Sequence, residues 1–474
     1  MEDADTSHFL AVDLGADSGR VILGTLSSSK LSLETVSRFP TKGTYMFNTL
    51  RWNVVRFWEE IKKGLSIVAG KKKINLKGIG VDSWGVNLVY LTGDRELAAI
   101  PFHYRDDLIN TGDERMRVTL DMDRVFSITG IQELKVNGLV HLFGVKKLYP
   151  GVLKRTRSII MIPDYFNYLL TGRLATEYTN ATTTQFFDAK QKKFSEELLK
   201  PLDIETSVFP EMLEPGTLIG PLHREVQLET GLGPVNVYTV ASHDTGSAIV
   251  GVPAEGDNWA YLSSGTWSLL GIELKTPIIT IRARKFNFTN EGGAFGTIRL
   301  LKNVMGLWLL QKCKEIWEKE SNKMFSYQEL SGEAEKETTD AIIDIDAPEF
   351  LNPRNMVEAI EQHCRENGQK TPETRGQIVR CIYQSLARKY QEVISQLEEV
   401  TGKKIERLYI VGGGSQDDLL NQIIAGTLKI EVCIGPVEAT AAGNIMLQAY
   451  ATGVVSGLSE IREIIRNSFT RYDH

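Results

Sequence analysis

The stretch Val237-Tyr-Thr-Val-Ala-Ser-His-Asp-Thr-Gly246 lies almost at the midpoint of the 474-residue chain. Its apolar run predicts a buried strand that ends near residue 241. The polar residues His243, Asp244 and Thr245 follow, and then a run of small residues compatible with a helix. A carboxylate at such a junction can be held rigidly at the mouth of a cleft. The stretch therefore predicts that Asp244 is a general base between two halves of the chain.

Length and composition favour a globular protein of two domains. Apolar residues make up 42% of the chain and charged residues 24%, and 54 basic against 60 acidic residues give a net charge of −6. This balance argues against nucleic acid as a partner. The acidic start Met1-Glu-Asp-Ala-Asp5 lacks the features of a signal peptide, and no run of 18 apolar residues occurs. We therefore expect a cytoplasmic protein without a membrane partner.

Four cysteines are scattered along the chain without the spacing of a metal site. Whether Cys364 and Cys381 pair is left open, because sequence spacing cannot establish a disulfide. The other two are Cys313 and Cys433.

Alternating strands and helices favour an α/β fold. A hairpin near the start joins predicted strands 8–14 and 21–26, and a second hairpin, just past the midpoint, joins strands 258–263 and 267–272. Residues 179–185 predict an irregular polar loop. Further strands are expected at 31–39, 77–81, 86–91 and 407–411, and helices at 54–68, 113–120, 138–148, 163–171, 303–319, 373–400, from the Gly412 turn to about 427, and 438–452.

Three turns rich in glycine and hydroxyl residues are candidates for phosphate binding. Backbone N–H groups of Gly15-Ala-Asp-Ser-Gly19 could face an anion, or the segment could be a plain tight turn. Asp13 could hold hydrated Mg²⁺ or be a surface carboxylate, and Arg20 could neutralise phosphate or form a salt bridge within the sheet. Ser263-Ser-Gly-Thr266 and Gly412-Gly-Gly414 are the other two turns. Together with Asp244 they indicate a phosphate site more strongly than any one alone.

These motifs, in this order, resemble those of the FGGY carbohydrate kinases, and the resemblance extends from about residue 8 to 450. It implies an α/β, two-domain actin/hexokinase-like (ribonuclease H-like) fold with the catalytic cleft between domains 1–241 and 242–474. The last helix could pack back on the first domain. The motifs that carry the resemblance are Asp13-Leu-Gly-Ala-Asp-Ser-Gly-Arg20, Ala241-Ser-His-Asp-Thr245, Ala260-Tyr-Leu-Ser-Ser-Gly-Thr-Trp-Ser268, Thr289-Asn-Glu-Gly-Gly293 and Val411-Gly-Gly-Gly-Ser-Gln416.

The resemblance also implies a role for each matching residue. Asp244 would take the proton from a sugar hydroxyl, and Asp13 would position Mg²⁺ through water. Asn303 would border the sugar, although a residue predicted at a helix start could also be an N-cap. The implied ATP contacts are Ala16, Asp17, Ser18, Gly19, Arg20, Thr266, Gln311 and Gly413, and the implied sugar contacts are Gly85, His243, Asp244, Thr245 and Asn303.

The pattern implies transfer of the γ-phosphate of ATP to O1 of L-rhamnulose. We expect a monomer or a homodimer, and the sequence leaves the choice between them open. Four residues depart from it: Asn87 replaces an expected aspartate, Glu133 and Lys135 replace apolar residues, and His141 replaces glutamine. They motivate an alternative substrate, another ketose or deoxy sugar such as L-fuculose or L-xylulose. A non-catalytic sugar-binding protein of the same fold is a further alternative, against which the presence of Asp13, Asp244 and Thr266 argues.

Overall fold

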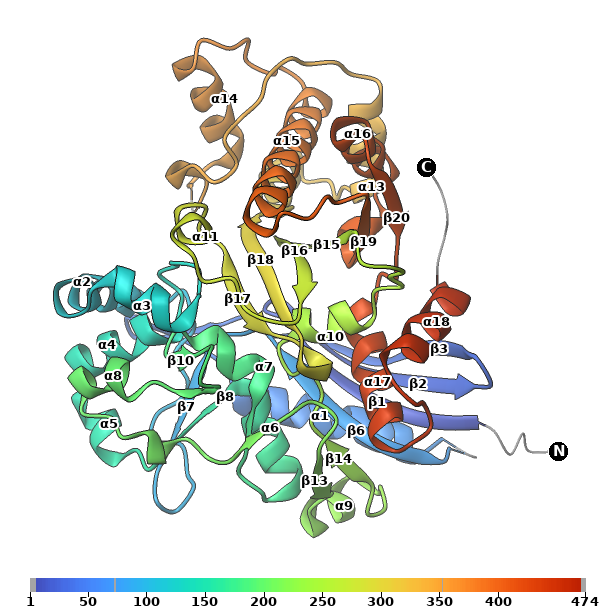
Figure 1. Ribbon diagram of the computed structural model, residues 1–474. Coiled ribbons are helices and arrows are strands. Elements are labelled where there is room, and N and C mark those ends of the chain that lie inside the picture. The colour runs from blue at the N-terminus through green and yellow to red at the C-terminus, as the bar shows by residue number, and fades with distance from the viewer. Residues whose placement is uncertain (1–5, 72–73, 352, 470–474) are drawn as a thin grey trace. The chain divides into compact units, whose positions relative to one another are not determined.

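The computed structural model describes residues 6–71, 74–351 and 353–469, so the acidic start at residues 1–5 lies outside the described part (Figure 1). Its elements follow the predicted alternation of strands and helices. No helix within these described ranges is long and apolar enough to cross a membrane.

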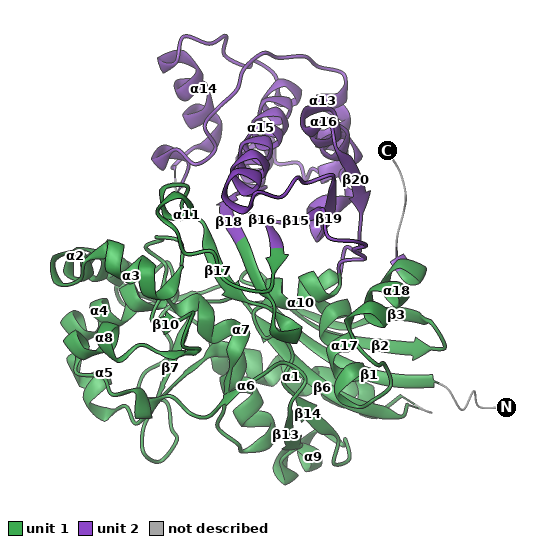
Figure 2. Ribbon diagram, viewed as in Figure 1, with its two compact units in different colours: residues 1–251, 273–300, 439–468 green, residues 252–272, 301–438, 469–474 purple. Residues whose placement is uncertain are grey.

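The chain forms two compact units, each assembled from separate segments (Figure 2). Strands β16 (Trp267–Leu274) and β18 (Ile298–Met305) each have residues in both units. The two continuous domains expected from the sequence stay a prediction, because these units are defined by compactness alone. Unit 1 contains residues up to 251 with 273–300 and 439–468, and unit 2 contains 252–272 and 301–438.

A six-stranded sheet of order β13-β14-β6-β1-β2-β3 organises unit 1. β1 pairs antiparallel with β2 and parallel with β6, which sets Asp13 opposite both Arg20 and Asp82. Paired residues on neighbouring strands project to the same face of a sheet. The three ionisable side chains therefore form a row. The strands are β1 (Thr6–Leu14), β2 (Ser18–Ser27), β3 (Lys30–Pro40), β6 (Leu76–Ser83), β13 (Leu218–Pro221) and β14 (Asn236–Tyr238).

A second six-stranded sheet, of order β17-β18-β16-β15-β19-β20, repeats part of this pattern. β15 pairs antiparallel with β16 and parallel with β19, and β19 pairs parallel with β20. These directions match those of β2, β1, β6 and β14, so the hairpin predicted in each half is confirmed. The new strands are β15 (Trp259–Ser264), β17 (Thr289–Gly292), β19 (Arg407–Val411) and β20 (Glu431–Ile434).

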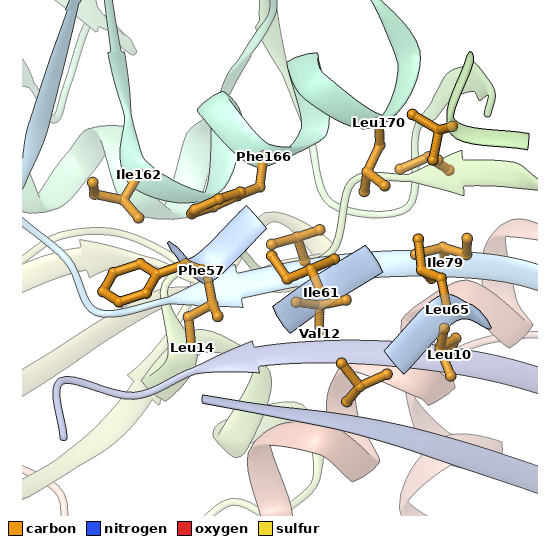
Figure 3. Packing of buried hydrophobic residues seen from close by; sticks show 14 of the residues in the cluster. Leu10, Val12, Leu14, Phe57, Ile61, Leu65, Ile79, Ile162, Phe166 and Leu170 are labelled. Carbon is orange, nitrogen blue, oxygen red and sulfur yellow. The ribbon is translucent and has the colours of Figure 1, made fainter. Parts of the chain in front are cut away.

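Helix α1 (Val54–Ala69) covers the first sheet because its apolar residues recur with helical spacing. Phe57, Ile61 and Leu65 of α1 lie between β1 and helix α6 (Ile162–Thr171), as Figure 3 shows. Each of these three side chains is at most 1% exposed. Burying a side chain of this size contributes about 1.5–3 kcal/mol. This core fixes β1, and with it Asp13, in place.

Two helices rich in small residues pack closely in unit 1. They are α10 (Asp244–Val250) and α17 (Ala439–Ala451), and α17 also packs on β1 and β6. A Cβ atom on Gly443 would lie 1.8 Å from the Ser247 carbonyl oxygen, and one on Gly251 would lie 2.4 Å from the Ala439 carbonyl oxygen. Glycine at these contacts allows the two backbones to meet.

The segment between β6 and β14 contains most of the remaining helices of unit 1. The prediction of an irregular polar loop at 179–185 is wrong, because residues 178–184 form short helical turns that are buried. Threonine hydroxyls there donate to carbonyl groups three residues earlier, which satisfies polar groups away from water. Its elements are β7 (Leu88–Leu91), α2 (Leu108–Thr119), α3 (Met122–Thr129), α4 (Gly138–Leu148), α5 (Pro150–Arg155), β8 (Ser158–Met161), β9 (Thr176–Glu177), α7 (Tyr178–Ala181), β10 (Phe187–Asp188), β11 (Lys193–Phe194), α8 (Glu196–Leu199), β12 (Met212–Leu213) and α9 (Arg224–Thr230).

The helix predicted to begin at Asn303 begins later, at Trp308, so Asn303 is not an N-cap. Residues 298–305 instead form β18, and the chain turns at Gly306. A Cβ atom on Gly306 would lie 2.6 Å from the Gly265 carbonyl oxygen, which explains glycine at the turn. The other elements outside the segment between β6 and β14 are β4 (Thr44–Met46), β5 (Thr49–Arg51), α11 (Ile281–Lys285), α12 (Trp308–Ser321), α13 (Tyr327–Glu335), α14 (Met356–Glu366), α15 (Arg375–Thr401), α16 (Asp418–Leu428) and α18 (Leu458–Phe469).

Candidate active site

Asp244 is the first residue of α10, directly after an extended segment that lies beside β6. The backbone N–H of Ser83 donates to the Ser242 carbonyl at 2.9 Å. The Asp244 side chain is 30% exposed, which a base that must reach a substrate requires. Its Oδ1 atom accepts from the Thr245 hydroxyl at 3.1 Å and lies 3.5 Å from His243 Nε2. The structure therefore brings together three residues that the sequence singled out.

Glu177 holds the segment immediately before Asp244. Its Oε2 atom accepts from the backbone N–H of Ser242 at 3.1 Å and from the Ser242 hydroxyl at 2.6 Å. It also accepts from the Thr179 hydroxyl, which in turn accepts from the backbone N–H of His243 at 3.2 Å. Burial raises the pKa of Glu177, while these hydrogen bonds oppose the shift. Sequence reasoning missed this role of Glu177, because Ser242 lies 65 residues further along the chain.

We expect Glu177→Gln to lower both stability and turnover. The amide keeps one oxygen acceptor but presents N–H groups to the donors of Ser242 and Thr179. Losing hydrogen bonds to a charged acceptor costs about 1.5–3 kcal/mol each. The free energy of unfolding, measured in urea, should fall by about 2 kcal/mol, and kcat should fall with it. The exposed Glu205→Gln is the control, and equal stability of the two variants would contradict the assigned role.

The turn between β1 and β2 carries the predicted phosphate contacts. Arg20 Nη2 donates to Asp13 Oδ2 at 2.7 Å, and the turn closes through Gly15 N–H to the Ser18 carbonyl at 3.1 Å. Asp17 is exposed at its tip. A Cβ atom on Gly19 would come within 2.5 Å of the Phe39 ring, so a larger residue would displace the turn.

Asp82 is a carboxylate of this site that sequence reasoning missed. It is fully buried opposite Asp13, and its Oδ2 atom accepts from the amide of Asn444. Burial raises its pKa, the charge of Asp13 raises it further, and the Asn444 hydrogen bond opposes both. Its Oδ1 atom has no hydrogen-bond partner among the described residues. The sequence did contain a signal for this role: Asp82 is an acidic residue directly after the predicted strand 77–81 and three positions before Gly85.

Gly85 is buried beside a cluster of aromatic side chains. A Cβ atom on Gly85 would lie 2.9 Å from the Thr183 hydroxyl. Asn87 Oδ1 accepts from the indole N–H groups of Trp52 at 2.8 Å and Trp84 at 2.9 Å, and Asn87 Nδ2 donates to the Phe102 carbonyl at 2.7 Å. An aspartate could not make the last bond. Asparagine at position 87 therefore satisfies the hydrogen-bonding groups of its buried neighbours.

Two buried histidines adjoin this cluster. His103 stacks on Trp52 with ring centroids 3.9 Å apart, and His141 Nε2 donates to the Tyr104 carbonyl at 3.3 Å. Burial lowers the pKa of His103 to about 3 and that of His141 to about 4. Both rings are therefore neutral at pH 7.

These shifts predict a loss of stability in acid that His141→Gln reduces. A histidine whose pKa is lower in the folded state than the ordinary 6.5 stabilises the fold above that value and loses the contribution as pH falls towards the folded pKa. From pH 7 to pH 5 each ring should cost about 2 kcal/mol. Glutamine can still donate to Tyr104 but does not titrate in this range. Urea unfolding at both pH values should show a pH-dependent loss about 2 kcal/mol smaller in the variant, and equal losses would contradict the assignment.

In unit 2, Thr266 lies in a turn that contacts the start of α12, which contains Gln311, and the turn adjoins the glycine turn that contains Gly413. The turn between β15 and β16 is bonded to the start of α12, since Trp308 N–H donates to the Thr266 carbonyl at 3.3 Å. Gln311 lies in the first turns of α12. Gly412 has φ +86°, which favours glycine. A Cβ atom on Gly414 would lie 2.0 Å from the Ser264 hydroxyl.

The two remaining predicted residues of unit 2 differ in exposure. Gly413 is exposed at the start of the short helical turn 413–416, and Asn303 is partly buried in β18.

The four cysteines are buried free thiols, and Cys364 contacts Cys381. Among the described residues no cluster of three or more His, Cys, Asp or Glu side chains could hold a metal ion.

Residues 8–251 match the N-terminal domain of the FGGY family of carbohydrate kinases, and residues 260–452 match its C-terminal domain. The chain belongs to this family and is a carbohydrate kinase, an enzyme class that uses ATP. Similar proteins include the rhamnulokinases of Bacteroides thetaiotaomicron, 42% identical over 97% of this chain and 94% of that protein, and of Ligilactobacillus salivarius, 41% identical over 97% and 94%. The rhamnulokinase of Oceanobacillus iheyensis is 40% identical over 98% of this chain and 97% of that protein.

Solved structures confirm the two-domain, actin-like fold. The gluconate kinase of Lactobacillus acidophilus superposes with a TM-score of 0.81 at 17% identity, covering 99% of this chain and 93% of that one. The glycerol kinase of Plasmodium falciparum, solved with ADP, has a TM-score of 0.77 at 15% identity, covering 99% and 93%. Identity this low bears on the fold alone.

Proposed function

We propose that this kinase transfers the γ-phosphate of ATP to O1 of L-rhamnulose and forms L-rhamnulose 1-phosphate. The observation that carries the proposal is the agreement of the relatives: several rhamnulokinases are about 40% identical over nearly the full length of both chains. Such coverage includes the sugar-side segments around Gly85 and His141 as well as the phosphate turns.

Asp244 is the general base in this proposal. Phosphoryl transfer needs alignment and charge stabilisation more than covalent chemistry. A carboxylate that accepts the hydroxyl proton needs hydrogen-bond reach and a fixed orientation. The partial exposure of Asp244 supports the first requirement, and its contact with Thr245 supports the second. His243, Thr245, Gly85 and Asn303 are the proposed sugar contacts.

The phosphate groups of ATP would meet the turn Ala16-Asp-Ser-Gly-Arg20, where backbone N–H groups and the Arg20 guanidinium stabilise negative charge. Arg20 is already held by Asp13, so little reorganisation is needed when phosphate arrives. Thr266, Gln311 and Gly413 are the proposed nucleotide contacts of unit 2. The hydrogen bonds between the Thr266 turn and α12 support a preformed arrangement there.

The carboxylates of unit 1 fit a hydrated Mg²⁺. Asp13 and Asp82 are neighbours on β1 and β6, and the buried Oδ1 atom of Asp82 has no hydrogen-bond partner in the described ranges. Mg²⁺ prefers oxygen ligands and retains several waters. We propose that Asp13 holds it through water, with Asp82 beside it. Bound Mg²⁺ would supply charge neutralisation for the transferred phosphoryl group.

Two departures on the sugar side have structural explanations that do not require another sugar. Asn87 is occupied by Trp52, Trp84 and the Phe102 carbonyl. Glu133 lies 3.3 Å from Arg117 and 3.2 Å from Arg284 in ion pairs, which accounts for a charged residue there. The alternative substrates L-fuculose and L-xylulose are therefore outcomes of the test. A cytoplasmic location and a monomeric or homodimeric state stay predictions.

A substrate panel tests the proposal. Purified protein with MgATP is offered L-rhamnulose, L-fuculose, L-xylulose and other ketoses, and ADP release is followed. We expect the highest kcat/KM for L-rhamnulose, with the phosphate at O1 by nuclear magnetic resonance (NMR). Higher kcat/KM for another sugar would reject rhamnulose as the substrate. Sugar binding without turnover on any member would favour the non-catalytic reading.

A further inference from the structure

His243 contacts a buried ion pair on the side of its ring away from Asp244. Arg299, in β18, is fully buried, and Glu291, in β17, is 5% exposed. Arg299 Nη2 lies 3.1 Å from His243 Nδ1 and 3.2 Å from Glu291 Oε2. Glu291 Oε2 in turn lies 3.2 Å from His243 Nδ1. The three polar groups therefore form a closed triangle inside unit 1.

The triangle constrains the charge state of its carboxylate. Burial alone would raise the pKa of Glu291, but the positive charge of Arg299 lowers it below its ordinary value. Glu291 is therefore ionised and pairs with Arg299. The guanidinium is oriented further by the bond from its Nε atom to the Gly292 carbonyl at 2.9 Å.

The hydrogen-bond geometry then decides the tautomer of His243. A guanidinium is only a donor, so the Arg299 N–H aimed at Nδ1 requires a lone pair on that atom. Nη2 can donate to Nδ1 at 3.1 Å, while its 3.2 Å contact with Glu291 Oε2 is an ion pair without a hydrogen bond. A proton on Nδ1 would instead point at the Arg299 N–H. The neutral ring therefore carries its hydrogen on Nε2, the atom that faces Asp244.

We propose that Arg299, paired with Glu291, is a positioning residue that fixes His243 as the neutral Nε2–H tautomer and so directs an N–H donor towards Asp244 and the sugar. This inference rests on the proposed roles of Asp244 and His243. The separation of 3.5 Å between Nε2 and Asp244 Oδ1 is too long for a strong hydrogen bond. The Nε2–H group of His243 is thus available to donate to a sugar hydroxyl, while the N–H dipole orients the Asp244 carboxylate.

The tautomer can be read directly from long-range ¹H–¹⁵N spectra of protein labelled at histidine. The chain has seven histidines, and His243→Gln assigns the signal of interest by its loss. We expect an unprotonated Nδ1 and a protonated Nε2 in the wild-type protein. Arg299→Met should reverse the tautomer, because the Glu291 carboxylate becomes the partner of Nδ1. Glu291→Gln should leave it unchanged, since Arg299 still donates.

Kinetics provide the second measurement. Arg299→Met should lower kcat/KM for the sugar by about a hundredfold, the scale of a misplaced reacting group, and leave KM for ATP unchanged. Glu291→Gln should have the smaller effect. A wild-type Nδ1–H tautomer would overturn the proposal even if Arg299→Met fails to fold, and so would an unchanged tautomer in a folded Arg299→Met. The spectra do not depend on the sugar. If no sugar in the panel is phosphorylated but the spectra show the Nε2–H tautomer of His243, the proposed function is rejected and the proposed role of Arg299 stands.

Discussion

Asp244→Asn should lose sugar phosphorylation while it still binds sugar and nucleotide. Asparagine has the same shape, so its side-chain oxygen can still accept from the Thr245 hydroxyl that contacts Asp244 Oδ1 at 3.1 Å. The amide cannot accept the proton of a sugar hydroxyl. Removing a general base typically costs a factor of about 10²–10⁴ in rate. We expect kcat to fall by at least that factor, with little change in either dissociation constant.

The measurement pairs an ADP-coupled assay with calorimetric titration of the sugar. Asp257→Asn is the matched control, because Asp257 is exposed outside the regular elements of unit 2. Its turnover should equal that of the wild-type protein. If Asp244→Asn turned over at the wild-type rate, Asp244 would have no role in proton transfer. If it lost sugar binding as well, its role would be that of a sugar contact.

Gly443→Ala should be among the most destabilising single substitutions in unit 1. Its new methyl group would lie 1.8 Å from the Ser247 carbonyl oxygen, far inside van der Waals contact. Both partners are backbone atoms of packed helices, so neither can move aside alone. Overpacking typically costs about 1–3 kcal/mol. The added methyl group should push α10 and α17 apart. Because α10 begins at Asp244, this shift should also reduce turnover.

Gly426→Ala supplies the contrast. Gly426 lies on an exposed face of α16, and a Cβ atom there would meet nothing within 4 Å. In a helix interior this change should stabilise the protein by about 0.5–1 kcal/mol. Thermal unfolding of the two variants should therefore shift in opposite directions. A Gly443→Ala protein as stable as Gly426→Ala would show that the contact between α10 and α17 is loose.

The regular elements were predictable wherever local pattern and tertiary demand agree. Helix α1 and the hairpins carry their apolar residues at the spacing that their burial requires. The prediction failed at residues 179–185, where polar side chains are buried because they bond to their own backbone. It also failed at Asn303, where the pairing of β18 takes precedence over a helical pattern that begins nearby.

By itself, the sequence determined the family, the alternation of strands and helices, and the motif residues such as Asp13 and Asp244. Those features are local, because each depends on the order of residues along a short segment. Only the tertiary structure showed Asp82 beside Asp13, Glu177 beneath Ser242, and Arg299 against His243. These partners are separated by dozens of residues, and pairing between distant strands and burial of polar groups decide them. Local periodicity does not contain that information.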